Sequence, residues 1–421
     1  MLRLQLAFVA STTATLVLPD QLPLQTSSRW IVDAKGTRVK LACVNWSGAA
    51  QKDGVVGGLQ HQPARRIAAL FAAQGFNCVR IPWSVASVRN PHNVTNQTLL
   101  AANAALLGRS NLDILDAVVE ACAAARLMVV LDNHMSDPDW CCSETDENGL
   151  WYNDRWPETE WLKAHVSLAT RYKSQPYVVA AELRNELRSA VVGGERRSPV
   201  WGGGSPSTDW RAAAQRAATA ILSARPSGLL IVVDGLSYST DLTGAYDAPL
   251  ALPVARRLVY SAHDYSWSQH VGSQAALHAL LGQRWGFLVA QGKPYTAPVW
   301  VSEWGDWHDG RDFGSGWWPW FEAYLRAADL DWAYWRGDGT ESRGTGRTFG
   351  AAAGFGVLNT SWDGPAAGGV LLRSLQPLQK ATQGPGVDRP AVAVAASPSA
   401  GMEDSHGSHL VQRQQRQEGL P

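Results

Sequence analysis

The sequence lacks several features that would assign it to common classes of protein. Its 37 basic and 37 acidic residues give a formal net charge of zero, without basic clusters. Such a chain offers no electrostatic surface for nucleic acid or for an anionic membrane. No run of about 18 apolar residues follows the N-terminal segment, so we expect no transmembrane helix. An uncharged or apolar ligand suits this composition best.

Three sequence motifs are also missing. The five cysteines include no Cys-x-x-Cys pair, which argues against a zinc site, and we expect no metal or organic cofactor. No Gly-x-Gly-x-x-Gly follows the first predicted strand, as a doubly wound nucleotide-binding fold would require. The Gly-x-Ser-x-Gly motif of a doubly wound esterase is absent too.

The cysteines fall into two groups. Cys141 and Cys142 are adjacent and follow a predicted strand, where a loop disulfide between the two neighbours can form. Cys43, Cys78 and Cys122 lie inside apolar segments, and we expect them to be buried thiols.

The chain divides into three parts by composition. Residues 1–25 carry a basic residue, Arg3, near their start and a short apolar stretch after it, as a secretory signal peptide does. Residues 381–421 are rich in Ala, Ser, Pro, Gly and Gln and predict a disordered tail, in which His406 and His409 are solvated. The part between them, 26–380, is expected to be the catalytic domain.

Glycosylation sequons agree with secretion to the extracellular space. Asn93 and Asn96 head Asn-x-Thr sequons in a polar loop, where an acceptor would be reachable. Asn45 heads a third sequon, but it adjoins a predicted strand and is expected to stay unmodified.

Strand-like and helix-like segments alternate through the middle of the chain. Helix-like spacing of apolar residues occurs after most of the strands, in segments 64–75, 112–126, 158–173, 210–224, 273–291, 318–329 and 368–380. Continuous apolar runs predict eight strands at 39–46, 78–83, 127–134, 177–183, 229–235, 258–265, 298–304 and 331–336. Eight strands joined by helices predict an α/β fold, the (β/α)8 TIM barrel, over the competing doubly wound sheet.

Polar residues stand at the ends of the predicted strands. In a TIM barrel these ends meet at one mouth, where the active site forms. The candidates in chain order are Arg80, Asp132, Asn133, His134, Asn185, Glu186, His263, Asp264, Tyr265, Glu303 and Trp335. Asp132 and Asp264 can equally be structural, and spacing assigns no role to Asp306, His308 or Asp309.

Two of these residues form a pair of acids suited to glycoside hydrolysis. That reaction needs an acid to protonate the leaving oxygen and a carboxylate to meet the charge at the anomeric carbon. Glu186 and Glu303 end the fourth and seventh strands and therefore face each other across the mouth. Arg80 and Tyr265 are available to support ionised Glu303, and Asn185 to hold a sugar hydroxyl.

The ordered motifs resemble glycoside hydrolase family 5, a family of retaining β-glycosidases. They are FNCVRIP, LDNH, RNE, HDY, SEWG and YW, spread from about residue 30 to about residue 378. The Trp-Cys-Cys stretch after the third strand looks like the plant-type branch of the family. By resemblance, Glu186 matches the acid/base and Glu303 the nucleophile. The matching site residues are Arg80, His134, Asn185, His263, Tyr265 and Trp335.

The sequence has 20 Trp residues, whose flat faces suit the apolar face of a sugar. Trp335 is expected to be a sugar platform, and Trp46, Trp140, Trp267 and Trp307 lie in or beside predicted mouth loops.

We therefore expect a secreted, retaining hydrolase of β-linked polysaccharide, foremost an endo-β-1,4-glucanase. The resemblance also covers mannan, β-1,3-glucan and glycolipid substrates. A non-catalytic carbohydrate-binding barrel is the alternative from another class.

Overall fold

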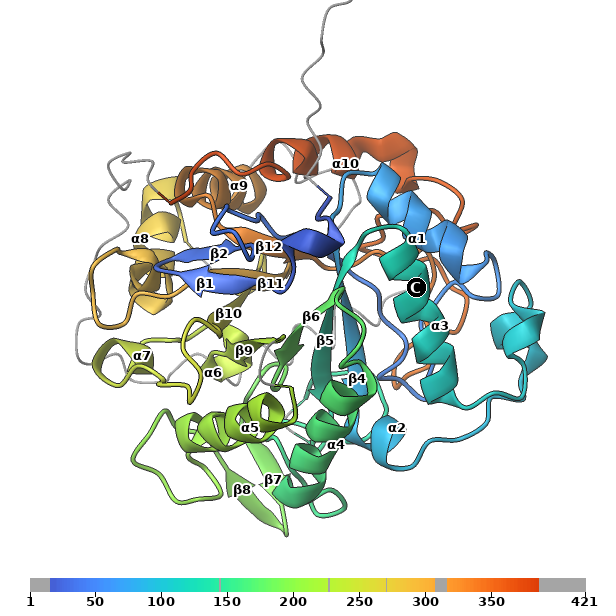
Figure 1. The fold of residues 1–421 in the computed structure, drawn as a ribbon, viewed down its shortest axis with the longest axis horizontal. Coiled ribbons are helices and arrows are strands. Elements are labelled where there is room, and N and C mark those ends of the chain that lie inside the picture. The colour runs from blue at the N-terminus through green and yellow to red at the C-terminus, as the bar shows by residue number, and fades with distance from the viewer. Residues whose placement is uncertain (1–15, 144, 226–227, 270, 307–315, 386–421) are drawn as a thin grey trace, which may run out of the picture.

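The fold is a closed barrel of eight parallel strands surrounded by helices (Figure 1). The computed structural model describes residues 16–385 except 144, 226–227, 270 and 307–315. The barrel strands, each overlapping a predicted one, are β3 (Ala42–Asn45), β4 (Cys78–Ser84), β5 (Met128–Met135), β6 (Val178–Glu182), β9 (Leu230–Asp234), β10 (Leu258–Tyr265), β11 (Val299–Gly305) and β12 (Asp331–Tyr334). The strands pair in chain order, and β12 closes on β3. The predicted (β/α)8 barrel is confirmed.

Helices connect the strands where apolar spacing predicted them. Side-chain caps mark the starts of four of them, because Ser84, Ser110, Asp209 and Ser273 each accept from a backbone amide of the first turn. The helices are α1 (Ala64–Ala73), α2 (Val85–Arg89), α3 (Asn111–Ala124), α4 (Glu158–Arg171), α5 (Trp210–Ala224), α6 (Leu236–Ser239), α7 (Gly244–Asp247), α8 (Gln274–Arg284), α9 (Trp317–Ala328) and α10 (Val370–Leu375). Short 3-10 turns are η1 (Pro19–Gln21), η2 (Gln97–Leu100), η3 (Ala104–Leu106), η4 (Gly286–Val289), η5 (Ala366–Gly369) and η6 (Gln376–Leu378).

Two hairpins add to the barrel. The first, β1 (Gln25–Ser27) with β2 (Trp30–Val32), lies at the N-terminal end of the barrel strands, where Leu24 and Ile31 join the interior core cluster. The second, β7 (Ala190–Val192) with β8 (Glu195–Arg197), projects beyond α4 and α5 in Figure 1. The first hairpin therefore plugs one barrel end and leaves the opposite end open for a site.

Strand residues alternate between the barrel interior and the helix layer. On β4, Cys78 belongs to the interior cluster, whereas Val79 and Ile81 pack with the helices. The same alternation points Arg80 inward, and this residue is completely buried. The interior is thus apolar near the plugged end and polar toward the mouth.

The cysteine prediction is partly wrong. Cys43 and Cys78 form a disulfide rather than two buried thiols. The physical reason is their register, because they are direct partners on neighbouring strands β3 and β4, with Cα atoms 4.3 Å apart. Cys122 is a buried free cysteine, as expected. The predicted disulfide between Cys141 and Cys142 is present.

Some predictions concern the two ends of the chain. Residues 1–15 of the predicted signal peptide and 386–421 of the predicted tail lie outside the described residues. Val17 is buried, and its carbonyl accepts from the Tyr177 hydroxyl at 3.0 Å. Residues 16–25 of that segment are described, and the signal peptide stays a prediction. Within the described ranges, no helix has the length and apolar character needed to cross a bilayer.

The sequons differ in accessibility. Asn93 is exposed and Asn96 is half-buried. Asn45 is fully buried, and its side-chain amide donates to the carbonyls of Ser302 and Tyr334. Its burial agrees with the expectation that Asn45 is not modified.

Candidate active site

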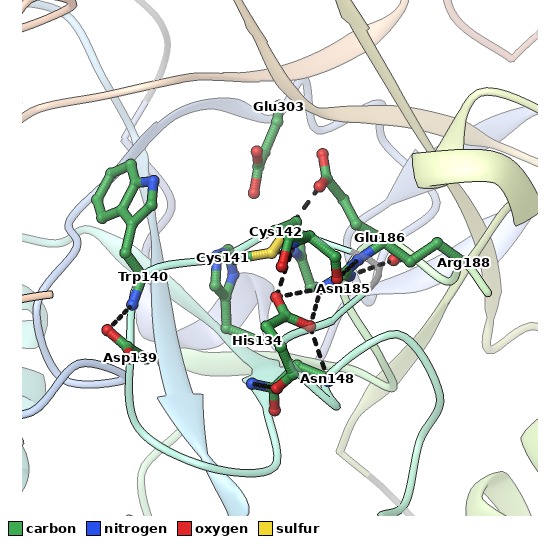
Figure 2. Close-up of a disulfide and its surroundings, with 12 residues drawn as sticks. His134, Asp139, Trp140, Cys141, Cys142, Asn148, Asn185, Glu186, Arg188 and Glu303 are labelled. Carbon is green, nitrogen blue, oxygen red and sulfur yellow. Dashed lines mark hydrogen bonds and ion pairs between the residues drawn. A yellow bond between two sulfur atoms is a disulfide. The ribbon is translucent and has the colours of Figure 1, made fainter. Parts of the chain in front are cut away.

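A cleft opens at the C-terminal ends of the barrel strands. The open space in and above it is about 560 Å³, solvent included. Figure 2 shows part of it, with Glu186 and Glu303 near the Cys141–Cys142 disulfide. The residues that line the cleft are Ser47, Gly48, Ala50, Gln51, Pro82, His134, Asp139, Trp140, Cys141, Cys142, Asn185, Glu186, Tyr265, Trp267, Glu303, Trp335 and Phe355.

Both carboxylate oxygens of Glu303 are held by hydrogen bonds. The Arg80 Nη1 atom lies 2.5 Å from Oε1, and the Tyr265 hydroxyl donates to Oε2 at 2.8 Å. Arg80 has no freedom to move, since its guanidinium also contacts Glu182, Asp132, Asn45 and Asn185. Glu303 is therefore a buried carboxylate of fixed orientation at the cleft wall.

Glu186 has a different environment. Its Oε1 atom lies 3.0 Å from His263 Nδ1, and burial raises the pKa of its carboxyl. The backbone φ of Glu186 is 45°, in the left-handed region, and Arg188 donates to its carbonyl at 2.9 Å. Arg188 is itself held by Asp146 at 2.7 Å. Glu186 therefore has an unfavourable backbone conformation, and this conformation directs its side chain into the cleft.

The two acids come close together. A carboxylate oxygen of Glu186, one of Glu303 and a ring nitrogen of His263 all lie within 4.8 Å of one another. Carboxyl groups about 5 Å apart suit attack by one of them on a sugar, whereas larger separations leave room for a water. Although such a trio resembles a cation site in composition, Arg80 and Tyr265 already bind the Glu303 oxygens.

The other predicted site residues also reach the mouth. The Asn185 Oδ1 atom accepts from Arg80 at 2.9 Å, which leaves its NH2 group toward the disulfide. His134 Nδ1 lies 2.7 Å from Asp132 Oδ2, and burial lowers the pKa of this imidazole to about 4. Trp335 stacks on His134 with ring centroids 5.6 Å apart. The structure thus brings all eight predicted site residues together.

The adjacent cysteines form part of the cleft wall beside these residues (Figure 2). Cys141 Sγ lies 4.0 Å from Glu186 Oε2 and 3.8 Å from Asn185 Nδ2. Both cysteines are half-buried. The disulfide therefore places apolar sulfur next to the carboxylate oxygen of Glu186 that His263 does not contact.

The tryptophans predicted in or beside the mouth loops do not all line the cleft. Trp46 is fully buried, donates to the Gly57 carbonyl and is not among the residues that line the cleft. Its strand-end position turns the ring outward, against α1. Trp140 and Trp267 do line the cleft, with the Arg347 guanidinium 3.8 Å above the Trp140 ring.

Several residues near the nucleophile candidate received no role from the sequence. Asp306 accepts from the Ser266 hydroxyl at 2.6 Å. Asp264 accepts from Gln269 and Trp317, which agrees with a structural role. Trp307, His308 and Asp309 lie outside the described residues.

Sequence reasoning missed a layer of polar residues below the mouth. Its members lie near the strand-end residues and point into the interior; they are Asn45, Glu182, Asp234, Ser261 and Ser302. The period-two alternation along each strand could have identified them once one inward residue was fixed.

Comparison with known proteins agrees with this geometry. The family model described as cellulase (glycosyl hydrolase family 5) matches residues 32–340. The chain belongs to glycosyl hydrolase family 5. A family 5 protein of Chamaecyparis obtusa is 34% identical over 75% of this chain and 58% of its own length. An endoglucanase of Paenibacillus polymyxa is 30% identical over 74% of this chain and 78% of its own length. The match therefore spans little more than half of the Chamaecyparis relative.

Solved structures of this family share the fold. The catalytic domain of the major endoglucanase from Xanthomonas campestris pv. campestris superposes with a TM-score of 0.71 and 26% identity. The match covers 85% of this chain and 99% of that domain. The Chamaecyparis protein is the plant relative that the Trp-Cys-Cys loop suggested, so the plant-type resemblance has partial support.

Proposed function

We propose that the protein is a retaining endo-β-1,4-glucanase of glycosyl hydrolase family 5. The observation that carries this proposal is the Glu186–Glu303 pair, whose oxygens approach within 4.8 Å in the cleft of a family 5 barrel. Relatives named endoglucanase, from Paenibacillus polymyxa and Xanthomonas campestris, support glucan as the substrate. Trp140, Trp267 and Trp335 supply apolar faces along the cleft.

In the first half of the proposed reaction, Glu186 acts as the acid. The raised pKa of Glu186 favours its protonated form, so it can protonate the glycosidic oxygen as the bond breaks. Glu303 attacks the anomeric carbon and forms a glycosyl-enzyme. The contacts from Arg80 and Tyr265 keep Glu303 oriented for that attack.

In the second half, Glu186 acts as a base. Having given up its proton, it removes one from water, which attacks the anomeric carbon and releases Glu303. Two inversions at one carbon give net retention. Asn185 and His134 stand where they can hold hydroxyls of the sugar, and Trp335 where it can carry the ring.

We also propose that the protein acts outside the cell. A Xanthomonas campestris relative is named a major extracellular endoglucanase. The exposed Asn93 sequon and the signal-like N-terminus support the same location.

The test is activity on carboxymethylcellulose, glucomannan, mannan and β-1,3-glucan, with Glu303→Ala as the inactive control. We expect release of reducing ends from carboxymethylcellulose with a rapid fall in viscosity, which identifies endo cleavage. Preferred cleavage of mannan or β-1,3-glucan would overturn the substrate. Binding of cello-oligosaccharides without any turnover would identify a carbohydrate-binding protein instead.

A further inference from the structure

A chain of hydrogen bonds runs from Glu186 into the floor of the barrel. His263 Nδ1 lies 3.0 Å from Glu186 Oε1, and His263 Nε2 lies 2.9 Å from Ser302 Oγ. Ser302 Oγ lies 2.6 Å from Ser261 Oγ, which is 3.2 Å from Asp234 Oδ1. His263, Ser302, Ser261 and Asp234 are at most 1% exposed, so these bonds are shielded from bulk solvent.

The imidazole of His263 restricts this chain to two arrangements. Burial lowers the pKa of His263 to about 4, so near neutral pH the ring carries a single proton. If the proton is on Nδ1, His263 donates to Glu186 and accepts from Ser302. If it is on Nε2, His263 donates to Ser302 and its Nδ1 accepts a hydrogen bond from a proton on Glu186 Oε1. Each serine hydroxyl can donate only one hydrogen bond. The hydroxyls of Ser302 and Ser261 must therefore both donate toward His263 or both donate away from it.

Asp234, at the inner end of this series of hydrogen bonds, favours the arrangement with the proton on His263 Nδ1. Burial and the neighbouring Glu182 raise the pKa of Asp234 well above its usual range. Among the described residues, Asp234 Oδ2 has no hydrogen-bond partner, a situation that a neutral carboxyl tolerates better than a carboxylate. Protonated Asp234 can donate to Ser261, which then donates to Ser302 and so to His263 Nε2.

The groups that surround Asp234 leave this proton in place. The Ser239 hydroxyl donates to Oδ1 at 2.9 Å and thereby lowers the pKa of Asp234, but burial and Glu182 outweigh this contact. The nearest His263 nitrogen is 3.9 Å away. Arg80, which opposes protonation of Asp234, is engaged by Glu182, Asp132 and Glu303. Ser261 Oγ also lies 3.2 Å from Glu182 Oε1, a longer contact than its 2.6 Å contact with Ser302 Oγ.

We propose that Asp234, Ser261 and Ser302 are positioning residues that hold His263 as the Nδ1–H tautomer. His263 then donates to Glu186 Oε1 whether Glu186 is protonated or ionised. The catalytic proton is left on Oε2, the oxygen beside the disulfide, where the glycosidic oxygen can receive it. This inference rests on the proposed function, because it assigns how the acid is presented.

The alternative arrangement would disable the acid. Starting from ionised Glu186, one proton would pass from Asp234 to Ser261 and a second from Ser261 to Ser302. A third would pass from Ser302 to His263 Nε2, and a fourth from His263 Nδ1 to Glu186 Oε1. The negative charge would move from Glu186 to Asp234, and no atom would be gained or lost. Glu186 Oε1 would then donate its proton in a hydrogen bond to His263 Nδ1, and this proton would be unavailable to the leaving group.

The experiment compares two substrates that differ in their need for an acid. Cellotetraose has a sugar leaving group that must be protonated, whereas 2,4-dinitrophenyl cellobioside has a leaving group that departs without a proton. For Ser302→Ala, we expect kcat/KM for cellotetraose to fall about 10- to 100-fold, part of the usual contribution of a general acid. For the dinitrophenyl substrate, we expect a fall of less than about threefold.

Conservative variants separate positioning from folding. Ser302→Thr keeps the hydroxyl and should recover most of the cellotetraose activity that Ser302→Ala loses. Asp234→Asn keeps an N–H donor at the inner end, so its cellotetraose activity should exceed that of Asp234→Ala. The comparison of Asp234→Asn with Asp234→Ala tests the inference even if a Ser302 variant does not fold.

Three results would overturn the inference. Equal losses on the two substrates would show a general structural role, and unchanged cellotetraose activity in Ser302→Ala and Asp234→Ala would show no role. Equal loss in Asp234→Asn and Asp234→Ala would show that a donor is not needed. Wild-type protein that cleaves neither substrate would refute the proposed function itself, and the inference with it.

Discussion

Removal of one hydroxyl from the site should reveal how much the fixed orientation of Glu303 contributes. In Tyr265→Phe, Glu303 Oε2 loses the donor that lies 2.8 Å away. The ring remains stacked on Trp267, with centroids 4.6 Å apart, so the cleft wall keeps its shape. The substitution therefore isolates one hydrogen bond to the proposed nucleophile.

The magnitude follows from the kind of bond that is lost. A hydrogen bond to a charged group contributes about 1.5–3 kcal/mol. Each 1.4 kcal/mol corresponds to a factor of about ten, so kcat/KM should fall about 10- to 150-fold. Since Tyr265 binds Glu303 and not Glu186, the loss should be similar for cellotetraose and for 2,4-dinitrophenyl cellobioside.

A matched control lies on the same strand. The Tyr260 hydroxyl accepts from the Leu250 backbone amide, away from the cleft. Tyr260→Phe makes the same chemical change and should leave kcat/KM within about twofold of wild type. The reasoning is refuted if Tyr265→Phe is equally active as wild type, or if Tyr260→Phe loses as much activity as Tyr265→Phe.

Three further predictions concern other parts of the molecule. Replacement of Cys141 and Cys142 by serine should bring water beside Glu186 and weaken the burial that raises its pKa, so the alkaline limb of the kcat/KM profile should move to lower pH. Burial raises the pKa of Asp264 to about 7, so its contribution to stability is fully present below about pH 4 and is lost as pH rises through 7. Asp264→Asn should therefore flatten the dependence of the unfolding free energy on pH in urea titrations over that window. Trp335→Ala should raise KM for cello-oligosaccharides by up to about tenfold through loss of an aromatic platform.

Each of these predictions has a control and a contradicting result. Cys122→Ala removes a buried thiol outside the cleft and should leave the pH profile unchanged, whereas an unmoved alkaline limb in the double serine variant would contradict the first prediction. A pH slope that persists in Asp264→Asn would contradict the second. For the third, Trp320→Ala alters a half-buried indole on α9 and should not change KM. An unchanged KM in Trp335→Ala would show that this ring does not carry sugar.

The strand-end residues were predictable because two simple rules apply to them. Apolar runs marked the strands, and parallel strands with helical connections meet at one mouth. Glu186 and Glu303 followed from these rules, and the family resemblance added their matching roles. The distance between the two carboxyl groups could not be predicted from these rules. It depends on the Arg80 contact that orients Glu303 and on the left-handed φ that orients Glu186.

The interior residues could not be assigned from the sequence for a physical reason. When both faces of a strand are buried, the apolar run does not show which residues face inward. For this reason Cys43 and Cys78 were expected to be thiols, and Ser261 and Ser302 were not noticed. One inward residue, such as Arg80, would have fixed the alternation on β4 and the orientation of Cys78 with it.

The β7–β8 hairpin was missed although the sequence contains its signal. Gly193 and Gly194 both have positive φ, as the two-residue turns that join hairpin strands require. The flanking segments have only three residues each and no long apolar run, so periodicity did not reveal them.

The most direct test of the account is to trap the covalent intermediate. The protein is incubated with 2,4-dinitrophenyl 2-deoxy-2-fluoro-β-cellobioside and digested, and the peptides are examined by mass spectrometry. The account predicts one fluorocellobiosyl group on the peptide that contains Glu303, and no label on the Glu303→Ala protein. A label on Glu186, or an active enzyme that never accumulates a label and releases the inverted anomer, would contradict it.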